Sequence, residues 1–325
     1  MTVLVTGAGG FIASHLTETL LRAGHEVRAL VHYNSRGNWG HLEEVADEYR
    51  KNLDVRLGDV RDPYLTRDIV DGCDVVFHLA ALIAIPYSYQ APASYLSVNA
   101  LGTENVLAAC KQCSVRRVIV TSTSEVYGTA RYTPMDEAHA LQAQSPYAAS
   151  KIAADKIAEA FYWSYGLPVV ILRPFNTYGP RQSARAVIPT VLTQALTGAA
   201  EIQLGNLEPQ RDLTFVSDTV KAFLLAAEKP GLEGQTIHCG QGDAVSIGEL
   251  AQLCVRVVGS KAQIVSVDER RRPAGSEVEL LMCDYSKAKQ LLGWQPEVSL
   301  EQGLTQTADY LAEHLANYRS EAYVL

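Results

Sequence analysis

Long hydrophobic runs are missing from this sequence of 325 residues, and so is an excess of positive charge. No apolar stretch approaches a length of about 20 residues, which a membrane-spanning helix needs. Lys and Arg total 28 against 36 Asp and Glu, and a net charge of −8 argues against binding a nucleic-acid backbone, which needs a basic face. Met1 is followed at once by the strand-like TVLVTG, which leaves no room for a signal peptide. We therefore expect a cytoplasmic protein that binds neither membranes nor nucleic acid.

Cysteine is also scarce, because six residues in a chain of this length do not indicate a disulfide framework. Cys110 and Cys113 form a C-x-x-C pair, a spacing found in redox and metal sites. Their helical spacing in NVLAACKQCSV places both on one face beside Val106, and no second pair or histidine at ligand spacing follows. We interpret them as ordinary buried cysteines and predict no metal site.

The first half of the chain alternates predicted strands and helices. We predict strands at Val3–Thr6, Glu26–Val31, 54–59, 73–80, 117–123 and 167–174. We predict helices at Phe11–Ala23, Leu65–Asp71, Tyr95–Cys113 and Tyr147–Tyr165. This alternation with apolar strands is typical of an α/β fold with a doubly wound parallel sheet of the Rossmann type.

The texture of the sequence changes after Pro174, where Pro and Gly become frequent and the predicted elements become short. We therefore predict a dinucleotide-binding domain at 1–174, to which 213–238 returns with a helix at 216–228. The remaining segments, 175–212 and 239–325, are predicted to form a smaller C-terminal lobe that binds the substrate.

A glycine-rich loop, VTGAGGFIASH, joins the first predicted strand to the first predicted helix. Gly7 permits a tight turn, and Gly10 lets the backbone approach a pyrophosphate. The small Ala13 allows close packing of helix and strand, while the helix N-terminus faces the phosphates. The loop follows a strand and opens a helix at the very start of the chain, and this context predicts dinucleotide binding.

The choice between NAD and NADP depends on the end of the second strand, RALVHYNSR. NAD sites usually carry an acid there to bind the ribose, but this chain has Val31 and His32. Arg36 could meet the additional phosphate of NADP, and His32 is either an adenosine contact or a solvent-facing residue. Asp59, after the third strand, is a candidate contact of the adenine edge or a surface turn residue. The cofactor is therefore NAD or NADP, with NAD favoured.

Candidate catalytic residues occur in SPYAASK and in the hydroxyl-rich stretch TSTSEVYG. Tyr147 and Lys151 are four residues apart, so a helix presents both on one face. The Lys151 ammonium beside the phenol is expected to let Tyr147 act as a base below its free pKa of roughly 10. Thr123 can hydrogen-bond the same substrate oxygen and orient it.

These motifs resemble those of the extended short-chain dehydrogenase/reductases of the sugar-nucleotide epimerase/dehydratase group. The resemblance covers nearly the whole chain, through TGAGGFIASH, GDVRD, FHLAA, VNALGT, STSEVYG, SPYAASK, RPFNTYGP, RDLTFVSD and DYSKAKQLLGWQP. It implies that Thr123, Tyr147 and Lys151 oxidise the C4 hydroxyl of a nucleotide sugar, with hydride passing to a tightly bound, recycled nicotinamide. The cofactor contacts that it implies, besides those named above, are Phe11, Ile12, Val60, Leu79, Ala80, Ala81, Asn99, Thr121, Tyr147, Lys151 and Pro174. It also implies substrate contacts at Thr123, Asn176, Arg211 and Arg272, although Arg272 could equally belong to the solvated charge run DERRRP.

Glu125 distinguishes this chain from simple C4 epimerases, which resemble it but carry a small hydroxyl residue at this position. Once C4 is a ketone, the C5 proton becomes removable by a positioned general base. Loss of the C6 hydroxyl gives an enone, and the reduced cofactor returns its hydride to C6. An enzyme that carries out these steps is a 4,6-dehydratase, with no net redox change. Ser124 is included in the catalytic set, because either it or a water must relay a proton to the departing hydroxyl. The alternative is a structural role, in which the Glu125 carboxylate caps nearby backbone amides.

The resemblance is strongest to 4,6-dehydratases acting on UDP-N-acetylglucosamine, with an echo of GDP-mannose dehydratase in LGNLEPQRD. UDP-glucuronate decarboxylases also carry STSEVYG. If this chain has that activity, Arg181 or Arg185 could bind the C6 carboxylate of the substrate. C4 epimerisation is a further alternative, and a non-catalytic dinucleotide-binding protein is another. On family grounds we expect a homodimer formed through the helices near residues 95–113 and 147–165.

Overall fold

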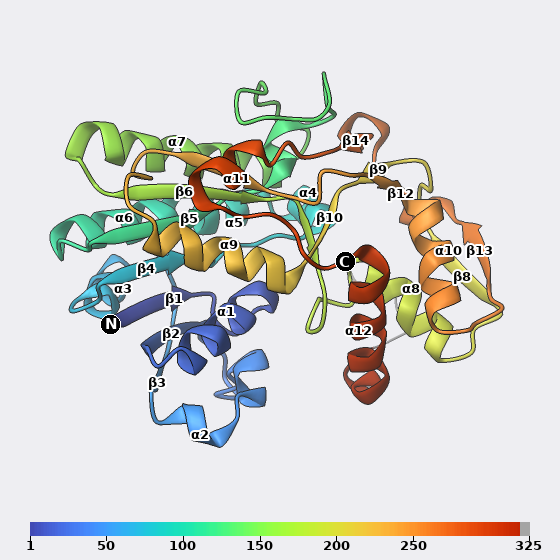
Figure 1. Cartoon of the computed structure of the whole chain (residues 1–325), viewed down its shortest axis with the longest axis horizontal. Helices are drawn as coiled ribbons and strands as arrows, with labels where there is room; N and C mark the ends of the chain where they lie inside the picture. The colour runs from blue at the N-terminus through green and yellow to red at the C-terminus, as the bar shows by residue number, and fades with distance from the viewer. Residues whose placement is uncertain (319–325) are drawn as a thin grey trace.

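The computed structural model describes residues 1–318, and its centre is a parallel sheet of seven strands (Figure 1). The strand order is β11-β6-β5-β4-β1-β2-β3. The bounds are β1 (Thr2–Thr6), β2 (Glu26–His32), β3 (Leu53–Gly58), β4 (Val75–His78), β5 (Arg117–Thr121), β6 (Val169–Pro174) and β11 (Thr236–Cys239). The order reverses between β1 and β4, which is the mark of a doubly wound sheet, so the predicted fold class is confirmed.

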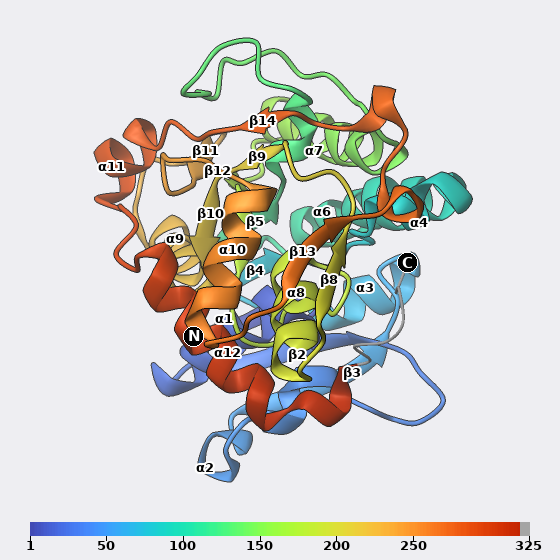
Figure 2. The ribbon, with the colours of Figure 1, turned by 90° about the vertical axis from the view of Figure 1, so that its right-hand side faces the viewer.

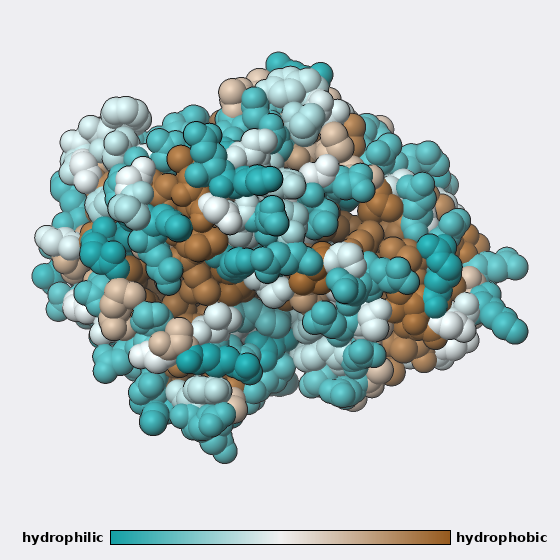
Figure 3. Space-filling model, viewed as in Figure 1, coloured by the Kyte–Doolittle hydropathy of each residue, from teal (hydrophilic) through white to brown (hydrophobic). Residues whose placement is uncertain are grey.

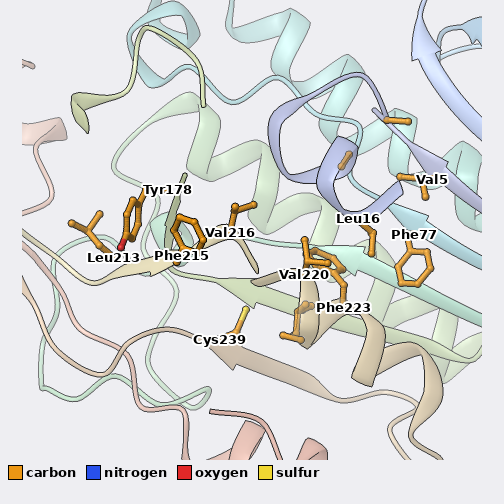
Figure 4. Packing of buried hydrophobic residues seen from close by; sticks show 14 of the residues in the cluster. Val5, Leu16, Phe77, Tyr178, Leu213, Phe215, Val216, Val220, Phe223 and Cys239 are labelled. Carbon is orange, nitrogen blue, oxygen red and sulfur yellow. The ribbon is translucent and has the colours of Figure 1, made fainter. Parts of the chain in front are cut away.

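Helices cover both faces of this sheet (Figure 1). One layer consists of α1 (Phe11–Arg22), α9 (Val216–Glu228) and α11 (Ser286–Leu292), and the other of α3 (Pro63–Val70), α6 (Gly102–Gln112) and α7 (Pro146–Tyr165). Val5 of β1 packs with Leu16 and Phe223 of the first layer (Figure 4), whereas its neighbour Leu4 packs with Leu107 of the second. Alternate residues of a strand point to opposite faces, so burial on both sides explains the uninterrupted apolar strands.

A second group of elements lies beside one end of the sheet, on the right of Figure 1 and facing the viewer in Figure 2. It contains α8 (Val187–Leu196), α10 (Ile247–Val257), α12 (Leu300–Glu313) and the pair β8 (Glu201–Leu204) and β13 (Gln263–Ser266). Two small sheets accompany it: β7 (Asn176–Tyr178) with β10 (Leu213–Phe215), and β9 (Gln210–Arg211) with β12 (Val245–Ser246) and β14 (Leu280–Leu281). Of the segment predicted to return at 213–238, α9 and β11 reach the main sheet, while β10 pairs with β7.

Short helices complete the architecture. They are α2 (Asp47–Arg50), α4 (Ile85–Gln90), α5 (Pro92–Tyr95) and 3-10 turns at Gly40–Glu44, Ser124–Tyr127, Asp268–Arg270, Ala274–Ser276 and Leu315–Asn317. The single helix predicted at 95–113 is wrong in detail, because a π-helical segment at Leu96–Leu101 separates α5 from α6. Within that segment the Asn99 carboxamide exchanges hydrogen bonds with the backbone of Leu82, at 2.8 and 2.9 Å.

The face drawn in Figure 3 is largely hydrophilic, with hydrophobic side chains showing between polar ones. No helix within residues 1–318 is long and apolar enough to cross a bilayer. All six cysteines are free thiols, and Cys110 is fully buried. The part of the chain that the structure describes holds no cluster of His, Cys, Asp and Glu able to bind a metal ion.

Candidate active site

A cavity of about 600 Å³ opens at the carboxyl ends of β1, β5 and β6, beside the point where the strand order reverses. In doubly wound sheets this crevice is where ligands bind. Most residues that the sequence analysis singled out line it: Gly7, Gly10, Phe11, Ile12, Leu79, Ala81, Thr121, Thr123, Ser124, Glu125, Tyr147, Lys151, Pro174, Asn176, Arg211 and Arg272. The structure therefore brings together residues separated by more than half of the chain.

Five predicted cofactor contacts lie outside the lining of this cavity: His32, Asp59, Val60, Ala80 and Asn99. His32 is exposed at the end of β2, and its Nδ1 lies 3.7 Å from Asp59 Oδ2 at the end of β3. Asp59 is also held by Arg61, whose hydrogen bonds keep the pKa of that carboxyl below its usual value. Asn99 is buried inside the molecule, where it donates to Ser150 Oγ at 2.9 Å.

The glycine-rich loop has the shape that a pyrophosphate needs. Gly7 has a φ of +70°, and a Cβ there would lie 2.8 Å from the Cα of Ala80. Gly10 is the N-cap of α1, and no side chain caps this helix end. The first N–H groups of the helix are therefore left for an anion, as a dinucleotide requires, and the loop fits NAD or NADP.

Tyr147 and Lys151 lie one turn apart near the start of α7, where the Ser145 hydroxyl accepts a hydrogen bond from the N–H of Ala148 at 3.1 Å. Both catalytic candidates are almost fully buried, at 7% and 5% exposure. The Lys151 ammonium donates to the carbonyl oxygen of Thr121 at 2.6 Å. The helix start and the end of β5 are thereby held together at the floor of the cavity.

The electrostatics of Tyr147 differ from the sequence-based expectation. Burial raises the pKa of its phenol, and the charge of Glu125 adds to the rise, while a hydrogen bond with Thr123 opposes it. Burial also lowers the pKa of Lys151. The predicted lowering by Lys151 is not what dominates here, because desolvation penalises the phenolate and the ammonium bonds to the Thr121 carbonyl. A cationic nicotinamide beside Tyr147 would favour the phenolate by the same Coulomb rule.

Glu125 lies in the 3-10 turn Ser124–Tyr127, not on a continued strand, because β5 ends at Thr121. The strand predicted at 117–123 is therefore two residues too long, and Thr123 and Glu125 do not lie on one strand. The Thr123 hydroxyl caps the turn by accepting the N–H of Glu125 at 3.2 Å. The Glu125 side chain lines the cavity, and within residues 1–318 its carboxylate accepts no hydrogen bond, so the alternative of amide capping finds no support. Ser124 is buried beside it and lines the same cavity.

The cavity also carries two arginines that contact one acid, Glu277, which the sequence analysis missed. Arg211 Nη2 lies 3.3 Å and Arg272 Nη1 lies 3.6 Å from the same Oε1 of Glu277. Arg211 is 7% exposed, and burial lowers the pKa of its guanidinium, whereas the charges of Glu125 and Glu277 raise it. Arg272 is thus part of the cavity and not merely of a solvated charge run. The sequence does not single out Glu277 in GSEVE as a site residue, because acidic residues are common on protein surfaces.

An apolar wall from the segment after β4 was also missed. Ile83, Ala84, Ile85 and Pro86 line the cavity, near Tyr95, whose ring meets the Tyr147 ring edge to face at 6.2 Å. Because these side chains are apolar, the sequence alone does not distinguish them from ordinary core residues.

The two arginines considered for a substrate carboxylate differ in availability. Arg181 is paired with Glu18 at 3.0 Å and with Glu44 at 3.1 Å, and it does not line the cavity. Arg185 lines the cavity, and its charge reaches Tyr95, where it lowers the pKa against the effect of burial.

Comparison with known proteins agrees with this geometry. The family model described as GDP-mannose 4,6 dehydratase matches residues 4–307. The chain is 33% identical to the uncharacterized UDP-glucose epimerase YtcB of Bacillus subtilis, over 96% of this chain and 98% of that protein. It is also 33% identical to the UDP-N-acetyl-alpha-D-glucosaminuronate decarboxylase of Bacillus cytotoxicus, over 95% and 97%. The dTDP-glucose 4,6-dehydratase DesIV of Streptomyces venezuelae, solved with NAD bound, superposes with a TM-score of 0.90 at 30% identity, over 98% and 99%.

The chain therefore belongs to the extended short-chain dehydrogenase/reductases of the NAD-dependent epimerase/dehydratase family. It is an enzyme of the group that contains nucleotide-sugar dehydratases, epimerases and decarboxylases. The predictions of this family and of an NAD or NADP cofactor are confirmed.

Proposed function

We propose that the protein is a nucleotide-sugar 4,6-dehydratase, with UDP-N-acetylglucosamine as the leading substrate. The observation that carries the proposal is the position of Glu125. Its carboxylate lines the same cavity as Thr123 and Tyr147, and it accepts no hydrogen bond within residues 1–318. A carboxylate that makes no hydrogen bond beside the redox residues is suited to remove a proton from carbon.

The residues divide the proposed reaction among them. Tyr147 takes the proton of the C4 hydroxyl, and Thr123 orients that oxygen. The bound dinucleotide supplies reversible hydride transfer and shows no net redox change. Glu125 removes the C5 proton, which the C4 ketone has made acidic, and the C6 hydroxyl leaves as water with a proton delivered through Ser124 or a bound water. The elimination leaves an enone, to which the reduced dinucleotide would return its hydride at C6 while C5 regains a proton, and the product is a 4-keto-6-deoxy sugar nucleotide.

The two arginines that line the cavity are suited to the diphosphate. Arg211 and Arg272 provide planar guanidinium groups that match phosphate oxygens. Glu277, which both contact, keeps them oriented and must share them with the diphosphate. Asn176 also lines the cavity, and its Nδ2 donates to the Asp212 carbonyl at 3.2 Å.

Incubation with UDP-N-acetylglucosamine in deuterated water tests the proposal. The expected product is lighter by one water and carries deuterium at C5, as seen by mass spectrometry and NMR. Accumulation of a C4 epimer alone would show that Glu125 does not act on C5. Stoichiometric cofactor binding without turnover of any nucleotide sugar would favour a non-catalytic dinucleotide-binding protein.

Decarboxylation of a nucleotide-linked uronic acid is the second candidate, and Arg185 is the observation that favours it. This cation lines the cavity and lies near Tyr95, whose ring packs on Tyr147, so it lies toward the reacting end. Arg181 is less suited, because two glutamates already pair with it. Release of CO₂ from UDP-glucuronate, abolished by Arg185→Ala, would promote this candidate over dehydration.

The predicted homodimer and cytoplasmic location stay predictions. Leu96 and Leu101, on the segment leading into α6, are 49% and 60% exposed and could be covered by a second copy. Sedimentation equilibrium of the purified protein measures the oligomeric state directly.

A further inference from the structure

A buried charged network lies directly behind the catalytic residues. Asp155 follows Lys151 by one turn of α7 and is fully buried. Its Oδ2 accepts hydrogen bonds from Arg173 Nη2 of β6 and from Ser122 Oγ, both at 2.6 Å. Arg173, itself 3% exposed, also donates from Nε to Ser122 Oγ at 3.2 Å. The ion pair therefore joins α7 to β6, and the hydrogen bonds of Ser122 attach both to the segment that follows β5.

A second branch of the network reaches the turn that carries Glu125. Arg173 Nη1 donates to the hydroxyl of Tyr127, and its guanidinium carbon lies 4.8 Å above the ring of Tyr127. The Tyr127 hydroxyl in turn lies 2.6 Å from Nε2 of His238 on β11. Tyr127 is the last residue of the 3-10 turn, so Arg173 holds both catalytic elements, the turn and helix α7.

Stability alone is a weak reason for such a pair. Burying two charges costs desolvation energy that their attraction repays only when every polar atom is satisfied. The second oxygen of Asp155, Oδ1, is buried and has no hydrogen-bond partner within the described residues. The Asp155 carboxylate therefore has one oxygen without a hydrogen bond, and this residue follows Lys151 by one turn of the same helix.

We propose that Asp155 is a positioning residue that keeps Lys151 charged and in place at the floor of the cavity, with Arg173 fixing the carboxylate and the Glu125 turn. The inference rests on the proposed function only in taking Tyr147 and Lys151 as the catalytic pair.

The groups around Lys151 determine whether each substitution raises or lowers the pKa of its ammonium. Burial lowers the pKa of Lys151, Asp155 on the same helix raises it, and Arg173 from β6 lowers it. His78 of β4 is neutral, because burial and the charge of Lys151 lower its pKa to about 3. Tyr147, one turn earlier on α7, is neutral as well, because burial raises its pKa. Without the Asp155 charge, Lys151 loses its proton at lower pH, and without the Arg173 charge it loses it at higher pH.

NMR titration of the full-length protein with NAD bound tests this directly. The Cε and Nζ signals of Lys151 are assigned by their loss in Lys151→Arg. In Asp155→Asn the titration midpoint is expected to fall by about one pH unit or more, the range that one close charge produces. In Arg173→Gln it is expected to rise, and in Asp155→Glu it is expected to return toward the parent value.

Because the midpoint is expected to fall in Asp155→Asn and to rise in Arg173→Gln, either of these two variants still tests the proposal if the other fails to fold. Asp218→Asn is the matched control, since Asp218 is a buried acid that accepts the N–H groups of Glu297 and Val298 and does not act on the pKa of Lys151. Equal midpoints in the parent protein and the Asp155 and Arg173 variants would overturn the proposal.

Turnover adds a second readout. The alkaline limb of the kcat/KM profile is expected to move in Asp155→Asn by the same shift that NMR shows, whereas a purely structural residue would lower the rate equally at every pH. A uniform loss together with an unmoved NMR midpoint rejects the inference. If no nucleotide sugar is turned over, the proposed function fails, while the NMR result still decides the role of Asp155.

Discussion

Lys151 donates a hydrogen bond of 2.6 Å to the carbonyl oxygen of Thr121, the last residue of β5. This contact joins the helix that carries Tyr147 to the strand end that leads into Thr123 and Glu125. The catalytic residues come from two elements, and their relative position depends on this junction and on the ion pair behind it. Substitutions can therefore distinguish residues that act in the reaction from residues that hold these two elements in place.

Tyr147→Phe is expected to lower kcat by about 100-fold or more, the usual worth of a general acid or base. The phenyl ring keeps the packing against Tyr95, so circular dichroism and cofactor binding should stay close to those of the parent protein. Tyr178→Phe is the matched control, because it also removes a buried hydroxyl, one that donates to Leu300 outside the cavity. An equal loss of rate in both variants would contradict a chemical role for Tyr147.

Glu125→Gln is expected to lower the rate of water loss by about 10²- to 10⁴-fold, since an amide cannot take the C5 proton. The variant should remain folded, as circular dichroism would show, because the carboxylate has no hydrogen bond to lose within residues 1–318. Oxidation at C4 should persist, and the absorbance of reduced nicotinamide should build up when substrate is added. Unchanged deuterium exchange at C5 would show that another group is the base.

Gly7→Ala is expected to abolish dinucleotide binding. The alanine would need a φ of +70°, and its Cβ would lie 2.8 Å from the backbone of Ala80, which cannot move freely. Gly24→Ala is the matched control, because φ is +82° there but nothing lies within 4 Å of the added Cβ. The control should lose only about 1 kcal/mol of stability and should bind NAD normally, as measured by calorimetry. Normal binding by Gly7→Ala would refute the assigned loop.

Much of this molecule could be predicted from the sequence because apolar strands, glycine turns and paired side chains on a helix are local signals. Six of the seven strands of the sheet and the meeting of Tyr147 with Thr123 follow from such signals, whereas β11 was not predicted as a strand. The π-helical segment at Leu96–Leu101 could not be predicted, since it depends on the distant backbone of Leu82. The raised pKa of Tyr147 was missed for a similar reason: a helical spacing indicates neighbours but not the degree of burial. Glu277 could not be predicted as a site residue, because only the folded chain places it beside Arg211.

Arg36→Ala should reveal which dinucleotide the chain prefers. Arg36 is exposed beyond β2, and within residues 1–318 only its backbone N–H makes a hydrogen bond, to Asn34 Oδ1. If NADP binds, its added phosphate would meet this guanidinium, and removal should weaken NADP by about tenfold while NAD is unaffected. Arg56→Ala on β3 serves as the control for net charge. Equal effects on both cofactors would exclude Arg36 as the selective residue.

His15 makes the stability of the fold depend on pH. Burial lowers the pKa of this α1 side chain from 6.5 to about 4, while its Nε2 lies 3.0 Å from the carbonyl oxygen of Pro180. Between pH 6.5 and about 4, His15 is protonated in the unfolded chain but not in the folded protein. The contribution of His15 to the free energy of unfolding is therefore complete above pH 6.5 and is lost as the pH falls toward 4. The shift corresponds to at most about 3 kcal/mol. Urea unfolding at several pH values should show a smaller loss of stability on acidification in His15→Gln, whereas His25→Gln should behave like the parent. A parallel decline in both variants would mean that other groups cause the acid sensitivity.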